Sequence, residues 1–156
     1  MHPNVELLDS FYSAFAAGDH ETMASAYADT ATFSDPVFPE LDANEARAMW
    51  KMFCTSGNDI RLSYTNVQAD DLKGSVEWEA VYRFPKTGRQ VHNRIHADFR
   101  FRDGKIVEHR DHFDLYAWTR MALGPIGVAA GWTPVLQGQV RKQAHRQLQR
   151  SMAKDG

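Results

Sequence analysis

Four polar residues of this 156-residue chain have the types and spacing that acid–base chemistry needs. His109 and Asp111 stand two residues apart in IVEHRDHFD, and Asn93 precedes them in RQVHNRIHADF. A carboxyl and an imidazole that are neighbours on one strand face can share a proton through a water or a substrate oxygen. Asp35, in FSDPVF, is a second carboxyl. An apolar setting disfavours the charged form of a carboxyl and so favours its use as acid or base.

A predicted hairpin over residues 89–114 carries three of these four residues. Its turn is Asp103-Gly104, a pair that tolerates positive φ at both positions. Alternation places on one face Val91, Asn93, Ile95, Ala97, Phe99 and Phe101 of the first strand and Val107, His109, Asp111 and Phe113 of the second. Isolated polar groups on such an apolar face must be hydrogen-bonded or cost free energy, so they form either a satisfied network or a site.

Three helices are predicted ahead of this hairpin, each with apolar residues at helical spacing. The expected limits are Asn4 to Gly18, Asp19 to Tyr27, and Asp42 to about Thr55, before Gly57. The first residue of each is an N-cap, and Asp42 with Glu45 predicts a capping box.

Alternating segments predict two further strands, one beginning near Ile60 and one over residues 75–84. The fold class is therefore α+β, with three N-terminal helices packed on one face of a curved antiparallel sheet. Glu77 and Glu79 alternate with the apolar residues of the second of these strands. Their facing stays open, because a one-residue slip of register exchanges the two faces.

Residues 117–156 are predicted to form a C-terminal helical extension of the domain that residues 1–116 define. A last helix opens at Thr133 or Pro134 and keeps an apolar side through Val140 and Leu148. The glycine-rich apolar segment GPIGVAAGWTP, residues 124–134, leads into this helix. This segment could close a pocket mouth or lie across a partner subunit.

Bulk properties exclude several classes of protein. A formal charge of −2 gives no reason to expect nucleic acid, and no run of 18 apolar residues predicts a membrane span. The single cysteine, Cys54, rules out an internal disulfide framework and favours a reducing cytoplasm. It falls on an apolar helix face, which favours an inert thiol over a nucleophile.

Three histidines, His92, His96 and His112, fall on the opposite face of the hairpin. His92 and His96 are about 13 Å apart at the strand rise of ~3.3 Å per residue, so they cannot chelate one metal ion unaided. No metal is expected. Cross-strand pairing with Asp98, Glu108 and Asp114 is the expected role.

Two segments are similar to parts of known enzymes. YADTATFSDPVF, residues 27–38, resembles the segment of ketosteroid isomerases that carries a general-base aspartate before a proline. GKIVEHRDHFD, residues 104–114, resembles the last strand of limonene-epoxide hydrolase and SnoaL-type cyclases, where an aspartate acts as acid or base. Over about residues 5–116 the chain resembles the SnoaL-like branch of the nuclear transport factor 2-like superfamily. The resemblance implies a conical pocket and a homodimer formed through the outer sheet face.

The resemblance also assigns roles to single residues. Asp35 stands where the isomerase base stands, Asp111 where the hydrolase activates water, and Glu79 near the hydrolase's second carboxylate. The other expected pocket residues are Tyr12, Phe33, Trp50, Asn93, Ile95, Phe99 and Phe113. The chain departs from these relatives at their oxyanion tyrosine, arginine and oxyanion aspartic acid, which are replaced by Phe11, Glu77 and Ala97. These departures exclude steroid isomerisation and limonene-type epoxide hydrolysis as specific activities.

The sequence therefore predicts a cofactor-independent acid/base enzyme, an isomerase, cyclase, hydratase or hydrolase, acting on an apolar, oxygenated, cyclic small molecule. Asp111 would be the acid or base, His109 its partner, Asp35 a second base or water holder, and Asn93 an orienting group. A non-catalytic ligand-binding or carrier dimer of the same fold is the alternative. A third, less favoured interpretation is a protein-interaction module that uses the outer sheet face.

Overall fold

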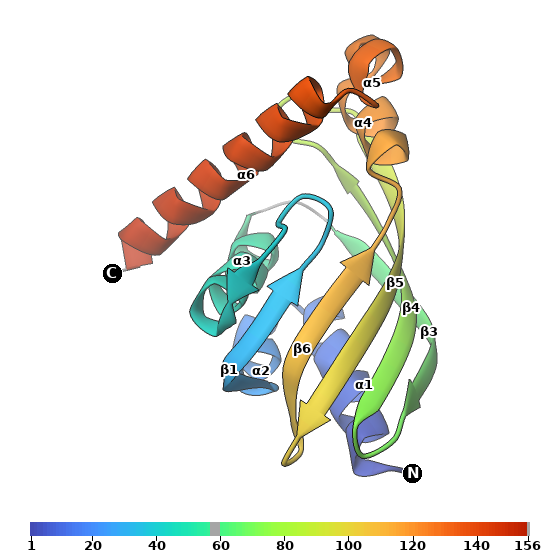
Figure 1. The fold of residues 1–156 in the computed structure, drawn as a ribbon, viewed down its shortest axis with the longest axis vertical. Helices are drawn as coiled ribbons and strands as arrows, with labels where there is room; N and C mark the ends of the chain where they lie inside the picture. The colour runs from blue at the N-terminus through green and yellow to red at the C-terminus, as the bar shows by residue number, and fades with distance from the viewer. Residues whose placement is uncertain (57–59, 156) are drawn as a thin grey trace.

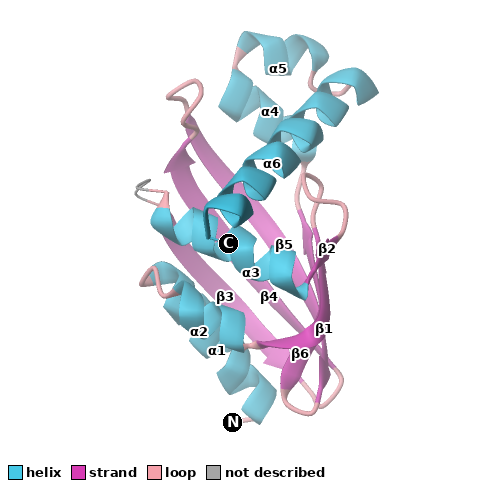
Figure 2. Cartoon of the chain, turned by 90° about the vertical axis from the view of Figure 1, so that its left-hand side faces the viewer, coloured by secondary structure: helices cyan, strands magenta, loops and turns pink. Residues whose placement is uncertain are grey.

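The computed structural model describes residues 1–56 and 60–155, arranged as a curved, unclosed sheet with helices on its concave side (Figures 1 and 2). The helices are α1 (Pro3–Ala16), α2 (His20–Ser25), α3 (Ala43–Thr55), α4 (Leu115–Leu123), α5 (Pro125–Ala130) and α6 (Pro134–Asp155). The strands are β1 (Tyr27–Ser34), β2 (Leu41–Asp42), β3 (Arg61–Ala69), β4 (Lys73–Arg83), β5 (Gln90–Arg102) and β6 (Lys105–His112). The predicted α+β class is confirmed; Gly57, predicted to follow the third helix, lies outside the described residues.

The sheet order is β2-β1-β6-β5-β4-β3. The four predicted antiparallel strands are β3 to β6, and their pairing is confirmed. The sequence pattern missed the role of residues 27–34, which form a full strand that pairs in parallel with β6. This pairing sets Phe33 opposite His109 and so brings the segment that ends at Asp35 to the hairpin.

The hairpin turn forms as predicted, because Asp103 has φ 52° and Gly104 has φ 75°. Arg102 pairs with Lys105 across this two-residue loop. The alternation that places Val107 on the inner face also predicts that Ile106 faces outward, and this is wrong. The register shifts between the pairs at Arg100 and Phe101, so that Val107 is an extra residue on β6. This bulge turns Ile106 inward, where it is fully buried, and leaves His109 and Asp111 on the expected inner face.

The helix N-termini follow the predicted capping with one correction. Asp19 caps α2 through the Thr22 amide, and Asp42 with Glu45 forms the capping box of α3. His2, not Asn4, caps α1, because its Nδ1 accepts from the amide of Asn4. The Asn4 side chain is instead buried and donates to the carbonyl of Asp70 at 3.0 Å.

The main core fills the space between α1, α2, α3 and the concave face of the sheet. It is rich in aromatic side chains, which include Phe11, Tyr12, Phe33, Trp50 and Phe99. A second, smaller cluster lies under α4 and contains Val91, Leu115, Trp118 and Ala122. At ~25 cal/mol per Å² of buried apolar area, such aromatic side chains dominate core stabilisation.

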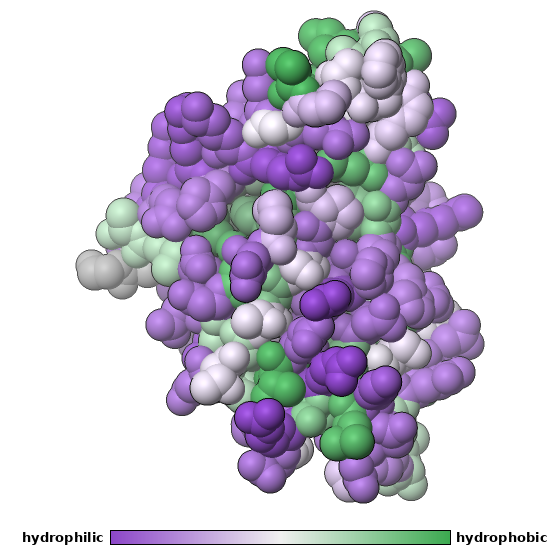
Figure 3. Space-filling view, in the orientation of Figure 1, coloured by the Kyte–Doolittle hydropathy of each residue, from purple (hydrophilic) through white to green (hydrophobic). Residues whose placement is uncertain are grey.

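The glycine-rich segment of the extension forms a short helix, α5, which the sequence did not predict. A Cβ on Gly127 or Gly131 would collide with Thr119 of α4, so only glycine permits this close approach of the two helices. The side chains of Ile126 and Val128 are exposed, and apolar surface gathers over α5 at the top of Figure 3. The chain itself therefore leaves these two apolar side chains largely uncovered.

Helix α6 is the part of the extension that crosses the concave side, over α3 (Figure 2). Its predicted apolar side is confirmed, since Leu148 is fully buried in the main core and Val140 packs against the second cluster. Arg141 donates from Nε to the carbonyl of Pro36 at 2.9 Å. The extension thus holds the loop that follows Asp35.

Among residues 1–56 and 60–155, no helix is long and apolar enough to cross a membrane.

Candidate active site

The pair His109 and Asp111 lies on β6 and faces the interior, as predicted. Both residues are buried, with 0% and 4% of their surface exposed. His109 Nε2 and Asp111 Oδ1 are 2.9 Å apart, which is hydrogen-bond distance. Trp78 on β4 donates from its indole Nε1 to the same oxygen at 3.4 Å.

Two residues on other elements complete this buried network. The Tyr27 hydroxyl lies 2.8 Å from His109 Nδ1, and Trp50 of α3 donates from Nε1 to that hydroxyl at 2.8 Å. The sequence predicts Trp50 as a pocket residue but does not single out Tyr27. The reason is that the pattern extends the second helix to Tyr27, whereas Tyr27 begins β1. Burial raises the pKa of Tyr27 well above its usual range, so the phenol keeps its proton.

Aromatic rings surround the imidazole of His109. Its ring centroid lies 4.2 Å from that of Phe99, 4.9 Å from Phe33 and 5.9 Å from Phe11. Tyr27 and Trp50 stack on it at 6.1 Å each. The ring therefore has one orientation, and each of its nitrogens faces a defined partner.

Asp35 lies just beyond the end of β1, two residues after Phe33. Phe33 pairs with His109, so Asp35 and Asp111 follow on the same face of neighbouring strands. Asp35 Oδ1 accepts from the backbone amides of Val37 and Phe38 at 2.7 and 2.6 Å. Within the described residues its other oxygen has no hydrogen-bond partner.

The Asp35 carboxyl is the titrating group best placed for proton transfer near neutral pH. Burial, opposed by the two backbone N–H groups and assisted by the negative charge of Asp111, raises the pKa of Asp35 to about 7. No cation contributes to this balance among the residues that the structure describes. The predicted proximity of Asp35 and Asp111 is thus matched by an electrostatic interaction between them.

Three further polar groups lie on the interior side of the sheet. The Tyr12 hydroxyl is fully buried and has no partner in the described chain. Asn93 is 8% exposed, and its amide likewise makes no hydrogen bond to a described residue. The Tyr82 hydroxyl accepts from Trp118 Nε1 at 2.8 Å, which leaves its own proton available.

Tyr82 is a candidate that sequence reasoning passed over. Burial chiefly, and then the negative charge of Asp35, raise the pKa of Tyr82 above its usual range. The hydroxyl is therefore close enough to Asp35 to respond to its charge. The signal was present in the sequence, because Tyr82 alternates in phase with Trp78, but nothing there distinguished it from a core tyrosine.

The expected pocket role of Glu79 is wrong. Glu79 pairs across the outer face with Arg94 at 3.2 Å and with His92 at 3.5 Å. The reason is parity: Val76, Trp78 and Ala80 occupy the buried face of β4, so Glu79 must face outward. Glu77 also faces outward, where it bonds His96.

The other predicted pocket residues divide by position. Ile95 and Phe99 are buried on the inner face of β5, with 4% and 3% of their surface exposed. Phe113 follows the end of β6 and is partly buried between the two core clusters. Phe113 therefore lies at the end of the sheet near α4 and not among the aromatic rings that surround His109.

Of the three acidic partners expected for the outer-face histidines, Asp98 is confirmed. Asp98 accepts from both His96 and His112, at 3.0 and 3.1 Å. Glu108 pairs with Arg110 at 2.6 Å rather than with a histidine. The expected pairing of Asp114 is wrong, because its side chain caps α4 through the amide of Ala117.

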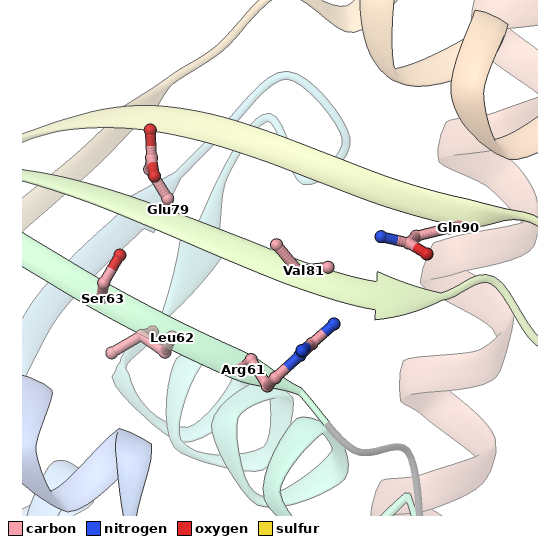
Figure 4. A pocket seen from close by; sticks show the side chains of 6 residues that line it. All are labelled: Arg61, Leu62, Ser63, Glu79, Val81 and Gln90. Atoms are coloured by element: carbon pink, nitrogen blue, oxygen red, sulfur yellow. The ribbon is translucent and has the colours of Figure 1, made fainter.

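Two surface hollows accompany this interior network. One lies on the outer face of the sheet, where residues of β3, β4 and β5 form its walls (Figure 4). The other lies between α2, α3 and the end of α6. Neither is lined by Asp35, Asn93, His109 or Asp111. Aromatic rings pack around His109 instead.

No group of three or more His, Cys, Asp or Glu residues is placed to hold a metal ion within residues 1–56 and 60–155. Cys54 is half-buried, and burial raises the pKa of its thiol. The thiol therefore stays protonated and is a poor nucleophile. The chemistry available at the site rests on carboxyls, an imidazole and phenols.

The curved, unclosed sheet with helices on its concave side is that of the nuclear transport factor 2-like fold. Within it, a family model of the SnoaL-like domain matches residues 8–109, which is more than half of the chain. The chain therefore belongs to the SnoaL-like family. No curated protein matches its sequence.

Solved structures agree with this assignment. An LEH-like epoxide hydrolase from M. tuberculosis has 18% identity and a TM-score of 0.65, over 85% of this chain and 96% of that one. IdmH, a proposed polyketide cyclase from Streptomyces antibioticus, has 20% identity and a TM-score of 0.63, over 77% and 98%. A protein of ketosteroid isomerase-like fold from Catenulispora acidiphila has 15% identity and a TM-score of 0.66, over 83% and 98%. At these identities the likeness shows the fold alone.

Proposed function

We propose that this protein is a cofactor-independent acid/base enzyme that acts on a neutral, apolar, oxygenated cyclic compound. The observation that carries the proposal is the placement of two carboxyls, Asp35 and Asp111, on one inner face in unequal surroundings. Asp111 is held by His109 and Trp78, whereas Asp35 is held by backbone amides and has a pKa of about 7. Such unequal pairs supply one group that carries a proton and one that accepts it.

Each residue then has a distinct role. Asp111 is the principal acid or base, and His109 fixes its orientation. Asp35 is the second base or holds a water molecule, since about half of its population is charged near pH 7. Asn93 and Tyr82 offer hydrogen-bond donors that can orient a ligand oxygen.

The electrostatics of the site favour a neutral ligand. Both carboxyls are acidic groups, and no lysine or arginine contributes to the environment of Asp35 in the described residues. An anionic ligand would be repelled at this face, whereas a ketone, epoxide or enol oxygen could accept from the phenols and the amide. Ring isomerisation, cyclisation and hydration or hydrolysis are the reactions that these groups can serve. The names of two structural neighbours, an LEH-like epoxide hydrolase and a proposed polyketide cyclase, fall within these reaction classes.

The test is a turnover screen with neutral cyclic ketones, lactones, epoxides and polycyclic enols, with products followed by mass spectrometry. Once one substrate is found, Asp111→Asn should lower kcat by about 10²-fold or more, which is the usual contribution of a general acid or base. Asp98→Asn, a matched change on the outer face, should leave kcat unchanged. An Asp111→Asn enzyme with wild-type kcat would contradict the assignment.

A non-catalytic ligand-binding protein is the second candidate. The observation in its favour is that Asp111 is buried and that its Oδ1 is already occupied by His109 and Trp78. A binder would show a raised unfolding temperature with members of the same compound set, by mass action, and no product with any of them. The turnover screen and a thermal-shift screen on one library therefore separate the two candidates.

We also propose that two copies associate through the outer face of the sheet. The supporting observation is that the charges of this face are paired within the chain, as in Arg94 with Glu79 and His112 with Asp98. Val81 lies on this face and lines the hollow of Figure 4. Val81→Arg should convert a dimer to a monomer in sedimentation, whereas an unchanged sedimentation coefficient would place any interface elsewhere.

A further inference from the structure

The buried chain Trp50–Tyr27–His109–Asp111 determines where its protons lie. Three hydrogen-bond distances connect its members in series: 2.8 Å, 2.8 Å and 2.9 Å. An indole N–H can only donate, so Trp50 occupies one lone pair of the Tyr27 oxygen. The remaining question is which way the hydrogen bond between Tyr27 and His109 points.

Tyr27 has only one place to put its own proton. Its hydroxyl is buried, and His109 Nδ1 is the only acceptor that it contacts in the described chain. If Nδ1 carried a proton and donated to Tyr27, the phenol proton would be left without an acceptor. Leaving a buried donor unpaired costs about 1–3 kcal/mol, so the arrangement in which Tyr27 donates is preferred.

The ring proton of His109 must then be on the other nitrogen. With Nδ1 acting as acceptor, a neutral imidazole carries its hydrogen on Nε2. That atom faces Asp111 Oδ1 at 2.9 Å, which is the geometry of an N–H···O bond to a carboxylate. A doubly protonated ring would again leave the Tyr27 proton unpaired.

We propose that Tyr27 is a positioning residue that holds His109 as the neutral Nε2–H tautomer, so that His109 is a fixed donor to Asp111 rather than a proton shuttle. Oδ1 of Asp111 then has two donors, His109 and Trp78. Oδ2 has no hydrogen-bond partner in the described residues and is the oxygen left to exchange a proton with a ligand. The statement about Oδ2 rests on the proposed function, whereas the tautomer of His109 does not.

Long-range proton–nitrogen NMR correlation on uniformly ¹⁵N-labelled protein tests the tautomer directly. The His109 signals are assigned by their loss in His109→Gln. We expect wild-type His109 to show a protonated Nε2 and an unprotonated Nδ1 at neutral pH. A protonated Nδ1 at neutral pH would overturn the proposal.

Two phenylalanine variants separate positioning from packing. In Tyr27→Phe, Nδ1 loses its donor, and His109 should take up a second proton at a pH where the wild-type ring still carries one. In Trp50→Phe, Tyr27 can still donate to Nδ1, so the tautomer and its pH range should stay those of the wild type. A Tyr27→Phe protein that titrates like the wild type would also overturn the proposal.

If Tyr27→Phe does not fold, the wild-type and Trp50→Phe spectra still decide the tautomer. Once a substrate is known, Tyr27→Phe should change the pH profile of kcat more than Trp50→Phe does. A Tyr27→Phe profile identical to that of the wild type would contradict the positioning role. Failure to find any substrate would instead count against the proposed enzyme function and leave the NMR result valid.

Discussion

The hairpin β5–β6 carries histidine–aspartate pairs on both of its faces, in opposite environments. On the inner face, His109 and Asp111 are 2.9 Å apart, with side chains that are 0% and 3% exposed. On the outer face, His112 and Asp98 are 3.1 Å apart, with side chains that are 56% and 52% exposed. The distance is nearly the same, so the difference between the pairs lies in their surroundings.

Burial changes what each pair can do. Water competes for the outer pair and screens it, so an exposed ion pair contributes only about 0–1 kcal/mol to stability. The inner pair is buried away from water, so each of its groups depends on the hydrogen bonds that neighbouring residues supply. The same residue types therefore serve as a surface contact on one face and as a candidate acid/base centre on the other.

Removing the imidazole should show this contrast most strongly. His109→Ala leaves Asp111 and Tyr27 without a partner and opens a cavity among aromatic rings, so it should lower the free energy of unfolding by about 3–5 kcal/mol. His112→Ala, its matched control on the outer face, should cost less than about 1 kcal/mol. Urea unfolding measures both values. Similar losses for the two variants would contradict the contrast.

Asp35→Asn tests the raised carboxyl pKa through the pH dependence of stability. A folded-state pKa of about 7 lies above the ordinary value of 3.8, so the folded protein binds the Asp35 proton more tightly than the unfolded chain. The stabilisation from Asp35 is thus complete below pH 3.8 and is lost as pH rises through about 7.

The expected slope is at most about 1.4 kcal/mol per pH unit between those limits, and partial exposure of Asp35 will reduce it. Asp35→Asn lacks this titration, so its free energy of unfolding should rise relative to that of the wild type as pH rises from 4 to 7. Denaturant unfolding across this range gives the difference. A difference that does not change with pH would show that Asp35 is charged like an ordinary aspartate.

Tyr12→Phe tests the one buried hydroxyl that has no partner in the described chain. Removing an unsatisfied buried donor should stabilise the fold by about 1 kcal/mol. Tyr64, whose ring stacks on that of Tyr12 at 5.4 Å, is the matched control, because its hydroxyl bonds Asp9 and Ser13. Tyr64→Phe should therefore lower stability slightly. A loss in Tyr12→Phe would indicate that a bound water or ligand satisfies the hydroxyl.

Glu77→Gln on the outer face should have the smallest effect. The hydrogen bond that His96 donates to the Glu77 carboxylate, and secondarily the one to Asp98, raises the pKa of His96 above its usual value. This contribution to stability is complete below pH 6.5 and is lost as pH rises through the folded-state pKa. Glu77→Gln should lower the His96 pKa in an NMR titration and change stability by less than about 1 kcal/mol. An unchanged titration would assign the shift to Asp98 instead.

Much of the fold could be predicted because its signals are local. The Asp103-Gly104 turn, the capping box at Asp42 and the parity of β5 each follow from neighbouring residues. Parity likewise placed His109 and Asp111 together, although a bulge at Val107 reversed the face of Ile106. A bulge inserts one residue into a strand, and no residue type marks the position of this one, so the sequence alone does not predict it.

The parts that escaped prediction depend on contacts between distant segments. Tyr27 and His109 are 82 positions apart, and only the parallel pairing of β1 with β6 brings them together. The resemblance to a relative places Glu79 in the pocket. The buried residues of β4 alternate with Glu79, which therefore faces outward. Likewise, Arg141 and Pro36 lie 105 positions apart, so no pattern could reveal that α6 supports the Asp35 loop.

Solvent-deuterium exchange tests the central claim that the inner carboxyls transfer protons. A neutral cyclic ketone that binds the protein is incubated in D₂O, and ¹H NMR follows loss of the protons next to its carbonyl. The wild type should accelerate this loss, Asp111→Asn should reduce the acceleration by about 10²-fold or more, and Asp98→Asn should not change it. Equal acceleration by wild type and Asp111→Asn would contradict the claim.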